Sequence, residues 1–382
     1  MIRNIRILYI HNFLVDFRFQ DAFRPIYFAQ ITGSYTLAMA VFSVQWITSA
    51  LADIPTGVLS DKMGRKFTIV LASACSTIGI AAWAFSAHSA GLFLGSIFCG
   101  LSECLFNGNN NALLYESLKS SGREGGFPHY QGRTSSMFQL ALGLSALCAS
   151  FLTGHGLRFL FILGIIPQAL SIIVGLFFKE PRMHMAAPQK SLRHLKDACI
   201  KIYGNTHLLL LVIAQAIGRA DEAKSQFQTI FVNTLWPTWA IGIYRAMNNG
   251  LGFFGFWFSG RIVDRLKETY VLAVQQAYQL VSQTIGLILS NVISPLLFIS
   301  GSIFHGPGIV ARDHLLQKEF TDEQRATMGS VASLAGSIVY AIAAFCIGII
   351  ADHFGLVAGV GFGVAISAIS LPLYVWLFRK DF

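Results

Sequence analysis

The sequence predicts an all-α membrane protein with twelve transmembrane helices in two six-helix halves. Hydrophobic residues make up 54% of the 382 residues and charged residues only 12%, about half the charged share of a soluble domain. A helix needs about 20 residues to cross a bilayer, so twelve spans and short loops fit this length. The net charge of +9 is explained by basic cytoplasmic loops, without nucleic-acid binding.

Long apolar stretches set the expected spans and the domain organisation. We expect spans at 7–30, 36–58, 67–86, 90–116, 131–153, 157–178, 207–232, 238–261, 270–290, 293–314, 328–350 and 356–378. The first six form an N-terminal bundle (1–178) and the last six a C-terminal bundle (207–382). A cytoplasmic linker (179–206) separates them. Its apolar positions Leu192, Leu195 and Cys199 suit a short interfacial helix, with a plain solvated linker as the alternative.

The connectors between spans alternate in charge. One set, counted with both termini and the adjoining ends of the spans, carries 22 of the chain's 28 lysines and arginines, whereas the opposite set carries Arg158 alone. Basic loops remain on the cytoplasmic side of inner and plasma membranes. Both termini are therefore expected in the cytoplasm.

Residues 57–66 form the connection between the second and third expected spans, and we call them the signature loop. They read Gly-Val-Leu-Ser-Asp-Lys-Met-Gly-Arg-Lys, and the alternative to a motif is an ordinary basic reverse turn. We expect Gly57 and Gly64 to allow close packing and a tight reversal. Asp61 is expected to accept hydrogen bonds from a helix N-terminus or to pair with a cation. The basic residues Lys62, Arg65 and Lys66 hold the loop in the cytoplasm.

This loop resembles the signature of the major facilitator superfamily, a family of transporters built from two six-helix bundles. The second half repeats the pattern at Gly260, Asp264 and Arg265, 203 residues further on. Residues 115–118 align with residues 312–315, 197 positions further on, and Glu116 and Asp313 are expected to act as cytoplasmic gate or loop-pairing residues. The resemblance extends over nearly the whole chain, and it specifies the fold rather than the substrate.

Ionisable residues within spans are costly and commonly face a water-filled cavity or one another. The chain concentrates them in its first and seventh spans, at Asp16, Arg18, Asp21, Arg24, Arg219, Asp221, Glu222 and Lys224. Several are i,i+3 neighbours and are expected to form ion pairs. In the superfamily these two helices face each other across the central cavity, so the resemblance places both clusters where substrate or protons bind.

Two further spans carry polar residues at helical spacing. The candidates for the substrate cavity are Glu103, Asn107, Asn110 and Asn111 in the fourth span and Arg245, Asn248 and Asn249 in the eighth. For the amides, a hydrogen bond that simply joins two helices is an equal alternative. For Glu103 and Arg245 we favour a functional role, because a lone charge deep in a span is expensive.

A buried carboxylate can take up a proton on one side of a membrane and release it on the other. The candidates are Asp16, Asp21, Glu103, Asp221 and Glu222. Asp21 is flanked by cations and should remain ionised. Asp16 and Glu103 have no obvious cationic partner on their own helices, so they are the first candidates for proton coupling.

The leading hypothesis is a proton-coupled secondary transporter that exports a small polar or amphiphilic molecule by alternating access. Import of an anionic nutrient or metal chelate of the siderophore type is the alternative, because intramembrane cations suit an anion. A transporter-like receptor or scaffold is the alternative from another class. The chain lacks the phosphate-binding and hydrolase motifs of enzymes. We therefore expect neither enzymatic activity nor a cofactor or metal, and a monomer in the lipid bilayer.

Overall fold

The structure is a computed structural model that describes residues 2–123, 127–180, 200, 202–204, 206–266, 268–319 and 322–377. The regular elements of these residues are all helices, and they include no β-strand. The chain divides into two compact units, of which the first comprises Met1–Tyr27 and Val44–Lys190 and the second Phe28–Ser43 and Ser191–Phe382. The interfacial helix predicted around residues 192–201 falls almost wholly outside the described residues.

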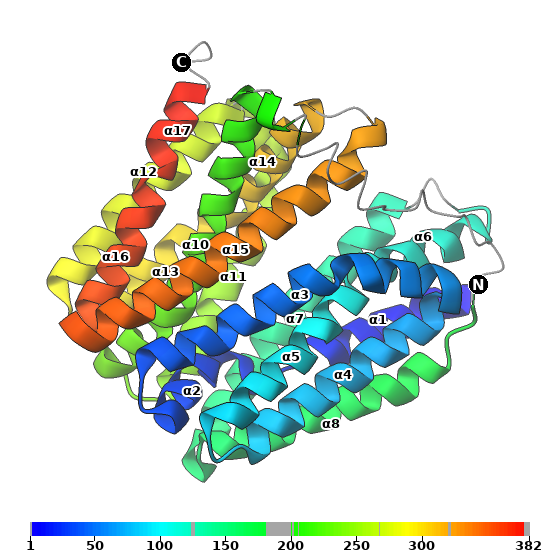
Figure 1. The fold of residues 1–382 in the computed structure, drawn as a ribbon, viewed down its shortest axis with the longest axis horizontal. Helices are drawn as coiled ribbons and strands as arrows, with labels where there is room; N and C mark the ends of the chain where they lie inside the picture. The colour runs from blue at the N-terminus through cyan, green and yellow to red at the C-terminus, as the bar shows by residue number, and fades with distance from the viewer. Residues whose placement is uncertain are drawn as a thin grey trace. The chain divides into compact units, whose positions relative to one another are not determined.

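The described residues of the first half of the chain form the helical elements shown from blue to green in Figure 1. They are α1 (Ile2–Asp16), η1 (Asp21–Phe23), α2 (Arg24–Thr32), α3 (Tyr35–Met63), α4 (Arg65–Phe85), α5 (Ser89–Phe106), α6 (Asn109–Lys119), α7 (Phe127–Leu152), η3 (Thr153–His155) and α8 (Leu157–Leu176).

The second half supplies the elements shown from green to red in Figure 1. Among the described residues these are α10 (Thr206–Leu235), α11 (Ala240–Leu266), α12 (Glu268–Leu289), α13 (Ser294–Ser300), η4 (Gly301–Phe304), α14 (His305–Glu319), α15 (Asp322–Phe354), α16 (Leu356–Ala368) and α17 (Ser370–Leu377). Each of the twelve expected spans therefore corresponds to one helix or to consecutive helical pieces.

The first expected span is not continuous. It ends as α1 at Asp16 and resumes at η1 and α2, so residues 17–20 leave the helix. The backbone carbonyl of Val15 accepts hydrogen bonds from Arg18 Nε at 2.8 Å and from Gln168 Nε2 of α8 at 2.8 Å. A break inside a membrane is tolerated where side chains satisfy the freed backbone groups, and these two side chains do so.

The fourth expected span is also broken, between α5 and α6. Asn107 is extended and Gly108 has φ +79°, a conformation that favours glycine. The side chain of Asn109 donates to the carbonyl of Leu105 at 2.8 Å and so satisfies one acceptor at the end of α5. Both expected spans are therefore interrupted at their polar residues, and the helical spacing expected for the polar residues of the fourth span does not continue through the break.

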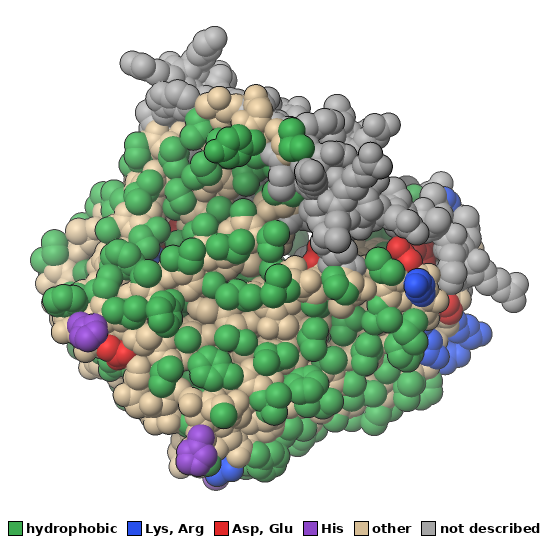
Figure 2. All heavy atoms as spheres, viewed as in Figure 1, with side chains coloured by type: hydrophobic (Ala, Val, Ile, Leu, Met, Phe, Trp, Pro, Cys, Tyr) green, Lys and Arg blue, Asp and Glu red, His purple; other side chains and the backbone are tan. Residues whose placement is uncertain are grey.

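Eight stretches among the described residues are long and apolar enough to cross a membrane, by length and composition. The expected spans outside this set correspond to α1–α2, α10, α11 and α12. Three of these four regions carry charged candidates. Charged residues lower the mean hydropathy of a helix, which explains why these regions do not meet the criterion. Figure 2 shows apolar side chains over most of the visible face, as a lipid-facing surface requires.

Phe28–Ser43 belongs to the second unit although it comes from the first half of the chain. Its anchor is Asp352, near the end of α15. The Asp352 carboxylate accepts hydrogen bonds from the backbone N–H of Tyr35 at 2.8 Å and of Thr36 at 2.9 Å, and from the hydroxyls of Ser34 and Thr36 at 2.7 Å each. Asp352 thus caps the N-terminus of α3 from another helix.

Replacing Asp352 with alanine should loosen the start of α3. The change removes the acceptor for two orphan backbone N–H groups, and an N-cap of this kind contributes about 1 kcal/mol. We expect a lower midpoint of thermal unfolding in detergent for Asp352→Ala, with partial recovery in Asp352→Asn because the amide retains one acceptor oxygen. Equal stability of Asp352→Ala and the wild type would contradict the capping role.

Candidate functional site

A cavity of about 480 Å³ lies within the first unit and opens among its polar helices. Its lining includes five charged side chains, Asp16, Arg18, Asp21, Arg24 and Glu103. It also includes the amides Asn12, Gln20, Gln45, Asn107, Asn110 and Asn111. Both helix breaks contribute to this wall, so the structure brings the candidates from the first and fourth spans together around one space.

The two arginines of the cavity are each engaged by an aspartate. Arg18 Nη2 lies 3.3 Å from Asp16 Oδ1, and Arg24 Nη2 lies 2.7 Å from Asp21 Oδ1. The second is the expected i,i+3 pair. The expectation that Asp16 has no local cation is wrong, because the break after α1 turns the side chain of Arg18 back towards it.

Glu103 is joined to this cluster through a neutral amide. Gln45 of α3 donates from Nε2 to Glu103 Oε2 at 3.2 Å, and its Oε1 accepts from Arg24 Nη1 at 3.4 Å. The two ends of one amide thus contact the carboxylate and the guanidinium. The glutamine has the orientation that serves both charges, since an amide nitrogen donates and an amide oxygen accepts.

Some of the cavity's polar atoms have no hydrogen-bond partner among the described residues. They include the side-chain oxygens of Asn12 and Asn110. Asn12 is only 3% exposed, so bulk water does not satisfy it. Buried polar groups are almost always hydrogen-bonded, and an unmatched acceptor in a cavity is a position for a ligand or an ordered water.

The second unit contains the other charged cluster. On α10, Arg219 Nη1 lies 2.9 Å from Glu222 Oε1, and Lys224 Nζ lies 2.6 Å from Asp221 Oδ1. Both pairs have the i,i+3 spacing expected from the sequence. Ser367 of α16 donates to Asp221 and accepts from Lys224 Nζ, the latter at 3.1 Å, so the second pair is tied to another helix.

These two ion pairs offer a matched comparison of burial. The side chain of Lys224 is 3% exposed, whereas those of Arg219 and Glu222 are 33% and 43% exposed. Lys224→Met should therefore leave Asp221 uncompensated and cost about 3–5 kcal/mol, the effect of breaking a buried pair. Arg219→Met should cost about 1 kcal/mol or less. Thermal unfolding of the two purified variants measures the difference, and equal losses would contradict the assignment of Lys224 as the buried partner.

The candidates of α11 join helices within the second unit. Arg245 Nη2 donates to Thr229 Oγ1 at 2.7 Å and to Gln226 Oε1 at 3.2 Å, both on α10. Asn248 Oδ1 accepts from Ser302 Oγ of η4 at 2.5 Å. Asn249 follows on α11 and is partly exposed. For Asn248, the structure has the helix-joining hydrogen bond that was the alternative to a cavity role.

Arg312 is a polar residue that the sequence analysis did not single out. It lies within α14, near the end of the expected span 293–314, with its guanidinium 3.0 Å from the position that a Cβ on Gly218 would occupy. Its Nε is buried without a hydrogen-bond partner in the described part of the chain. An arginine flanked by apolar residues on one side is the signal that could have identified it.

His11 of α1 was also missed. It is fully buried, its Nε2 lies 3.1 Å from Ser73 Oγ of α4, and its ring stacks on Phe106 at 6.0 Å between centroids. Gln168 of α8 was missed as well. A lone polar side chain in an apolar span was the available signal for both.

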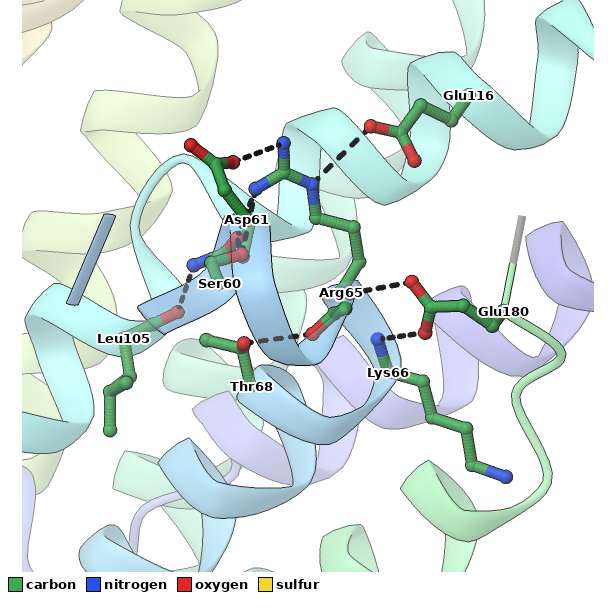
Figure 3. Close-up of polar contacts among 10 residues, drawn as sticks. Ser60, Asp61, Arg65, Lys66, Thr68, Leu105, Glu116 and Glu180 are labelled. Carbon is green, nitrogen blue, oxygen red and sulfur yellow. Dashed lines mark hydrogen bonds and ion pairs between the residues drawn. The ribbon is translucent and has the colours of Figure 1, made fainter. Parts of the chain in front are cut away.

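The signature loop is organised around Arg65, as Figure 3 shows. Its Nη2 lies 3.2 Å from Asp61 Oδ1, and its Nε lies 3.3 Å from Glu116 Oε1 on α6. Its Nη1 donates to Ser60 Oγ at 2.7 Å and to Asn109 Oδ1 at 3.0 Å. Asp61 therefore pairs with a cation, which was one of its two expected roles. Glu116 contacts the signature loop, as expected of a loop-pairing residue. Lys62 is exposed.

The N-terminus of α4 is capped by a residue that was not singled out. Glu180, just after α8, accepts hydrogen bonds from the backbone N–H of Arg65 at 2.7 Å and of Lys66 at 2.8 Å (Figure 3). The neighbouring residue Lys179 is held by Asn4, with hydrogen bonds of 2.8 and 3.0 Å through both ends of the Asn4 amide. Two consecutive residues after α8 thus hold the signature loop and the start of α1.

The two glycines of the signature loop have different surroundings. Gly64 has φ +91°, and a Cβ there would lie 2.7 Å from the Glu180 carboxylate. Gly57 lies inside α3, and a Cβ there would meet nothing within 4 Å in the described structure. The close packing expected at Gly57 is therefore wrong, whereas Gly64 makes the reversal.

The repeat of this motif in the second half is described only in part. Gly260, Asp264 and Arg265 lie on α11, and Asp313 lies on α14. Arg265 is exposed, while the side chains of Asp264 and Asp313 are outside the described residues. No group of three or more His, Cys, Asp and Glu side chains suited to a metal ion occurs in the part of the chain that the structure describes.

Comparisons with known proteins identify the fold. The family model for the Major Facilitator Superfamily matches residues 13–338. A crystal structure of a variant of the nucleoside transporter NupG superposes with a TM-score of 0.82 at 13% identity, over 98% of this chain and 99% of that one. No curated protein sequence matches.

Two other solved structures have the same fold. A D-xylose–proton symporter has a TM-score of 0.74 at 12% identity and covers 98% of this chain and 96% of that one. A bacterial homologue of the human lysosomal transporter Spinster, captured inward-facing and unoccupied, has a TM-score of 0.79 at 15% identity over 99% and 98%. The family match over most of the chain and the shared fold lead to one conclusion: the chain belongs to the major facilitator superfamily and is an integral membrane transporter.

Proposed function

We propose that this transporter exports a small polar or amphiphilic molecule in exchange for protons, by alternating access around the first-unit cavity. The observation that carries the proposal is the charge of the cavity wall. Three carboxylates and two guanidinium groups line it, so the wall bears one surplus negative charge when all five groups are ionised. A charge buried in a membrane protein is expensive unless it is neutralised.

We assign the surplus negative charge of the cavity wall to Glu103. Arg18 and Arg24 are engaged by Asp16 and Asp21, whereas the Glu103 carboxylate takes its hydrogen bond from the neutral amide of Gln45. A proton or a group on the cargo can neutralise Glu103. Binding of the proton therefore disfavours binding of the cargo, and the reverse is also true. Binding a proton from one side then promotes release of cargo, which is the basis of exchange.

This assignment orders the proton-coupling candidates. Glu103 comes first and Asp16 second, with Asp21, Asp221 and Glu222 as ion-pair partners. The proposal includes a location in the inner or plasma membrane, with both termini in the cytoplasm, and function as a monomer. The basic signature loop and its basic repeat support that orientation.

Import of an anionic nutrient or metal chelate is the second candidate, and one observation favours it. The second unit holds Arg245 and Arg312 in addition to the two balanced ion pairs of α10. Such an excess of cations suits an anion.

The test is comparative metabolite profiling of cells and growth medium, with and without the gene. A compound that accumulates in the deletion cells and disappears from their medium supports export and identifies the cargo. A compound left unconsumed in the medium identifies an importer. Equal profiles, together with a phenotype that Glu103→Gln leaves intact, would favour a receptor or scaffold.

Proton coupling is then tested with the identified compound in proteoliposomes. Flux should follow an imposed pH gradient and stop when the exchanger nigericin collapses that gradient. Flux that continues unchanged after collapse would refute coupling to protons.

A further inference from the structure

We propose that the cargo of the first-unit cavity carries a protonated amine, so that it is a cationic or zwitterionic organic compound whose ammonium group binds at Glu103. The inference rests on the proposed function at the same cavity and names the chemical class of its ligand. The inference is limited to the head group of the cargo, because the charges and hydrogen-bond acceptors of the cavity wall select that part of the molecule.

The ion pairs of the wall disfavour an anionic head group. An anion that bound Arg18 or Arg24 would compete with Asp16 at 3.3 Å or Asp21 at 2.7 Å. The guanidinium of Arg24 also lies 5.7 Å from the centroid of the Trp83 ring, over its face. Among the described residues no ion pair engages Glu103, so a cation that binds there displaces none, and its charge balances the surplus of one carboxylate on the wall.

The unmatched polar atoms of the wall favour a donor of hydrogen bonds. The side-chain oxygens of Asn12 and Asn110 are acceptors without a partner among the described residues. An acceptor buried without a donor costs about 1–3 kcal/mol. An ammonium group carries three N–H donors and no acceptor, whereas a carboxylate carries acceptors alone. An ammonium group therefore suits both the carboxylate of Glu103 and these two oxygens.

The size of the cavity sets the scale of the cargo. Its volume of about 480 Å³ lies in the range of small-molecule sites. Phe106 and Phe138 add aromatic surface to the wall. A compact aromatic or aliphatic body with one amine head group matches these dimensions and this mixture of surfaces.

The test uses two sets of probes, each with a constant body and a varied head group. One set is phenethylamine, N-acetylphenethylamine and 3-phenylpropionate, and the other is hexylamine, N-hexylacetamide and heptanoate. Binding to the purified full-length protein in lipid nanodiscs is measured by titration calorimetry at neutral pH. We expect the amine of at least one set to bind about tenfold or more tighter than its neutral and anionic analogues.

Variants locate the head group. Glu103→Gln should remove the preference for the amine, whereas Glu103→Asp, which keeps the charge, should retain it. Glu268→Gln makes the same chemical change at the start of α12 and should leave the preference intact. The thermal unfolding midpoint of each variant shows that loss of binding does not reflect loss of folding.

Several outcomes would overturn the inference. They are equal affinity for an amine and its acetylated analogue, tighter binding of the carboxylates, no binding of either amine at millimolar concentration, or an amine preference that survives Glu103→Gln. Failure of the proposed function looks different. If amines bind selectively but a pH gradient drives no flux, proton coupling falls and the ligand class stands. If the gradient drives flux of a compound without an amine, proton coupling stands and the proposed ligand class is wrong.

Discussion

Glu103→Gln should uncouple transport from the pH gradient while the protein remains folded. Glutamine has the shape of glutamate, can still contact Gln45 and cannot exchange a proton. In the wild type, Glu103 Oε2 accepts from Gln45 Nε2 at 3.2 Å, and loss of the charge leaves the two aspartate–arginine pairs of the cavity intact. We expect gradient-driven flux to fall about 5- to 150-fold, the range of ordinary coupling free energies.

The measurement is flux of the identified compound in proteoliposomes, with and without an imposed pH gradient. Exchange of compound for compound at equal pH should persist in Glu103→Gln, because that process needs no proton. Asp16→Asn is the comparison inside the cavity, and it should reduce stability because Arg18 loses its partner at 3.3 Å. If Glu103→Gln retains gradient-driven flux and a folded Asp16→Asn loses it, the coupling carboxylate is Asp16.

Gly64→Ala should clearly destabilise the first unit, because it adds a methyl group at a backbone conformation that favours glycine. At φ +91° and ψ 159° a residue with a Cβ is strained by about 1–3 kcal/mol. The new methyl would also lie 2.7 Å from the carboxylate of Glu180. Displacing Glu180 would remove the cap of α4, which contributes about 0.5–2 kcal/mol more. We expect a clear fall in unfolding temperature and in the amount of protein that reaches the membrane.

Gly57→Ala is the matched control, since it adds the same methyl to the same motif. Its site is a helix interior with open space, where alanine in place of glycine adds about 0.5–1 kcal/mol of stability. In the double variant Gly64→Ala with Glu180→Ala, the collision is gone but the backbone strain remains, so the two losses should not add. Equal effects of alanine at the two glycines would contradict the roles assigned to them.

Features encoded by nearby residues were predictable from the sequence. Long apolar stretches and the signature loop predicted the superfamily fold, and the family match and the solved structures confirm it. The i,i+3 pairs of α10 were predictable because an unbroken helix fixes which side chains are neighbours. In the first span the rule held for Asp21 and Arg24 but failed for Arg18, because the chain leaves the helix after Asp16 and pairs Arg18 with a residue only two positions away.

Features that depend on distant residues were not predictable. Gln45 and Glu103 are 58 positions apart, and Asp352 is 316 positions from Thr36. Helical periodicity describes one helix and carries no information about which side chain another helix presents. Arg312 was missed for a related reason: its position near the end of a span gives no sign that it packs against Gly218 of another helix.

The contacts made by Lys179 and Glu180 have a consequence for biosynthesis. The signature loop is synthesised 115 residues before the side chain that caps it, and Asn4 is made 175 residues before its partner. At translation rates of about 5–20 residues per second, the loop waits about 6–23 s for its cap. The first unit therefore reaches its final arrangement only after α8, its sixth expected span, has left the ribosome. A nascent chain arrested before Glu180 should leave the signature loop accessible to proteases.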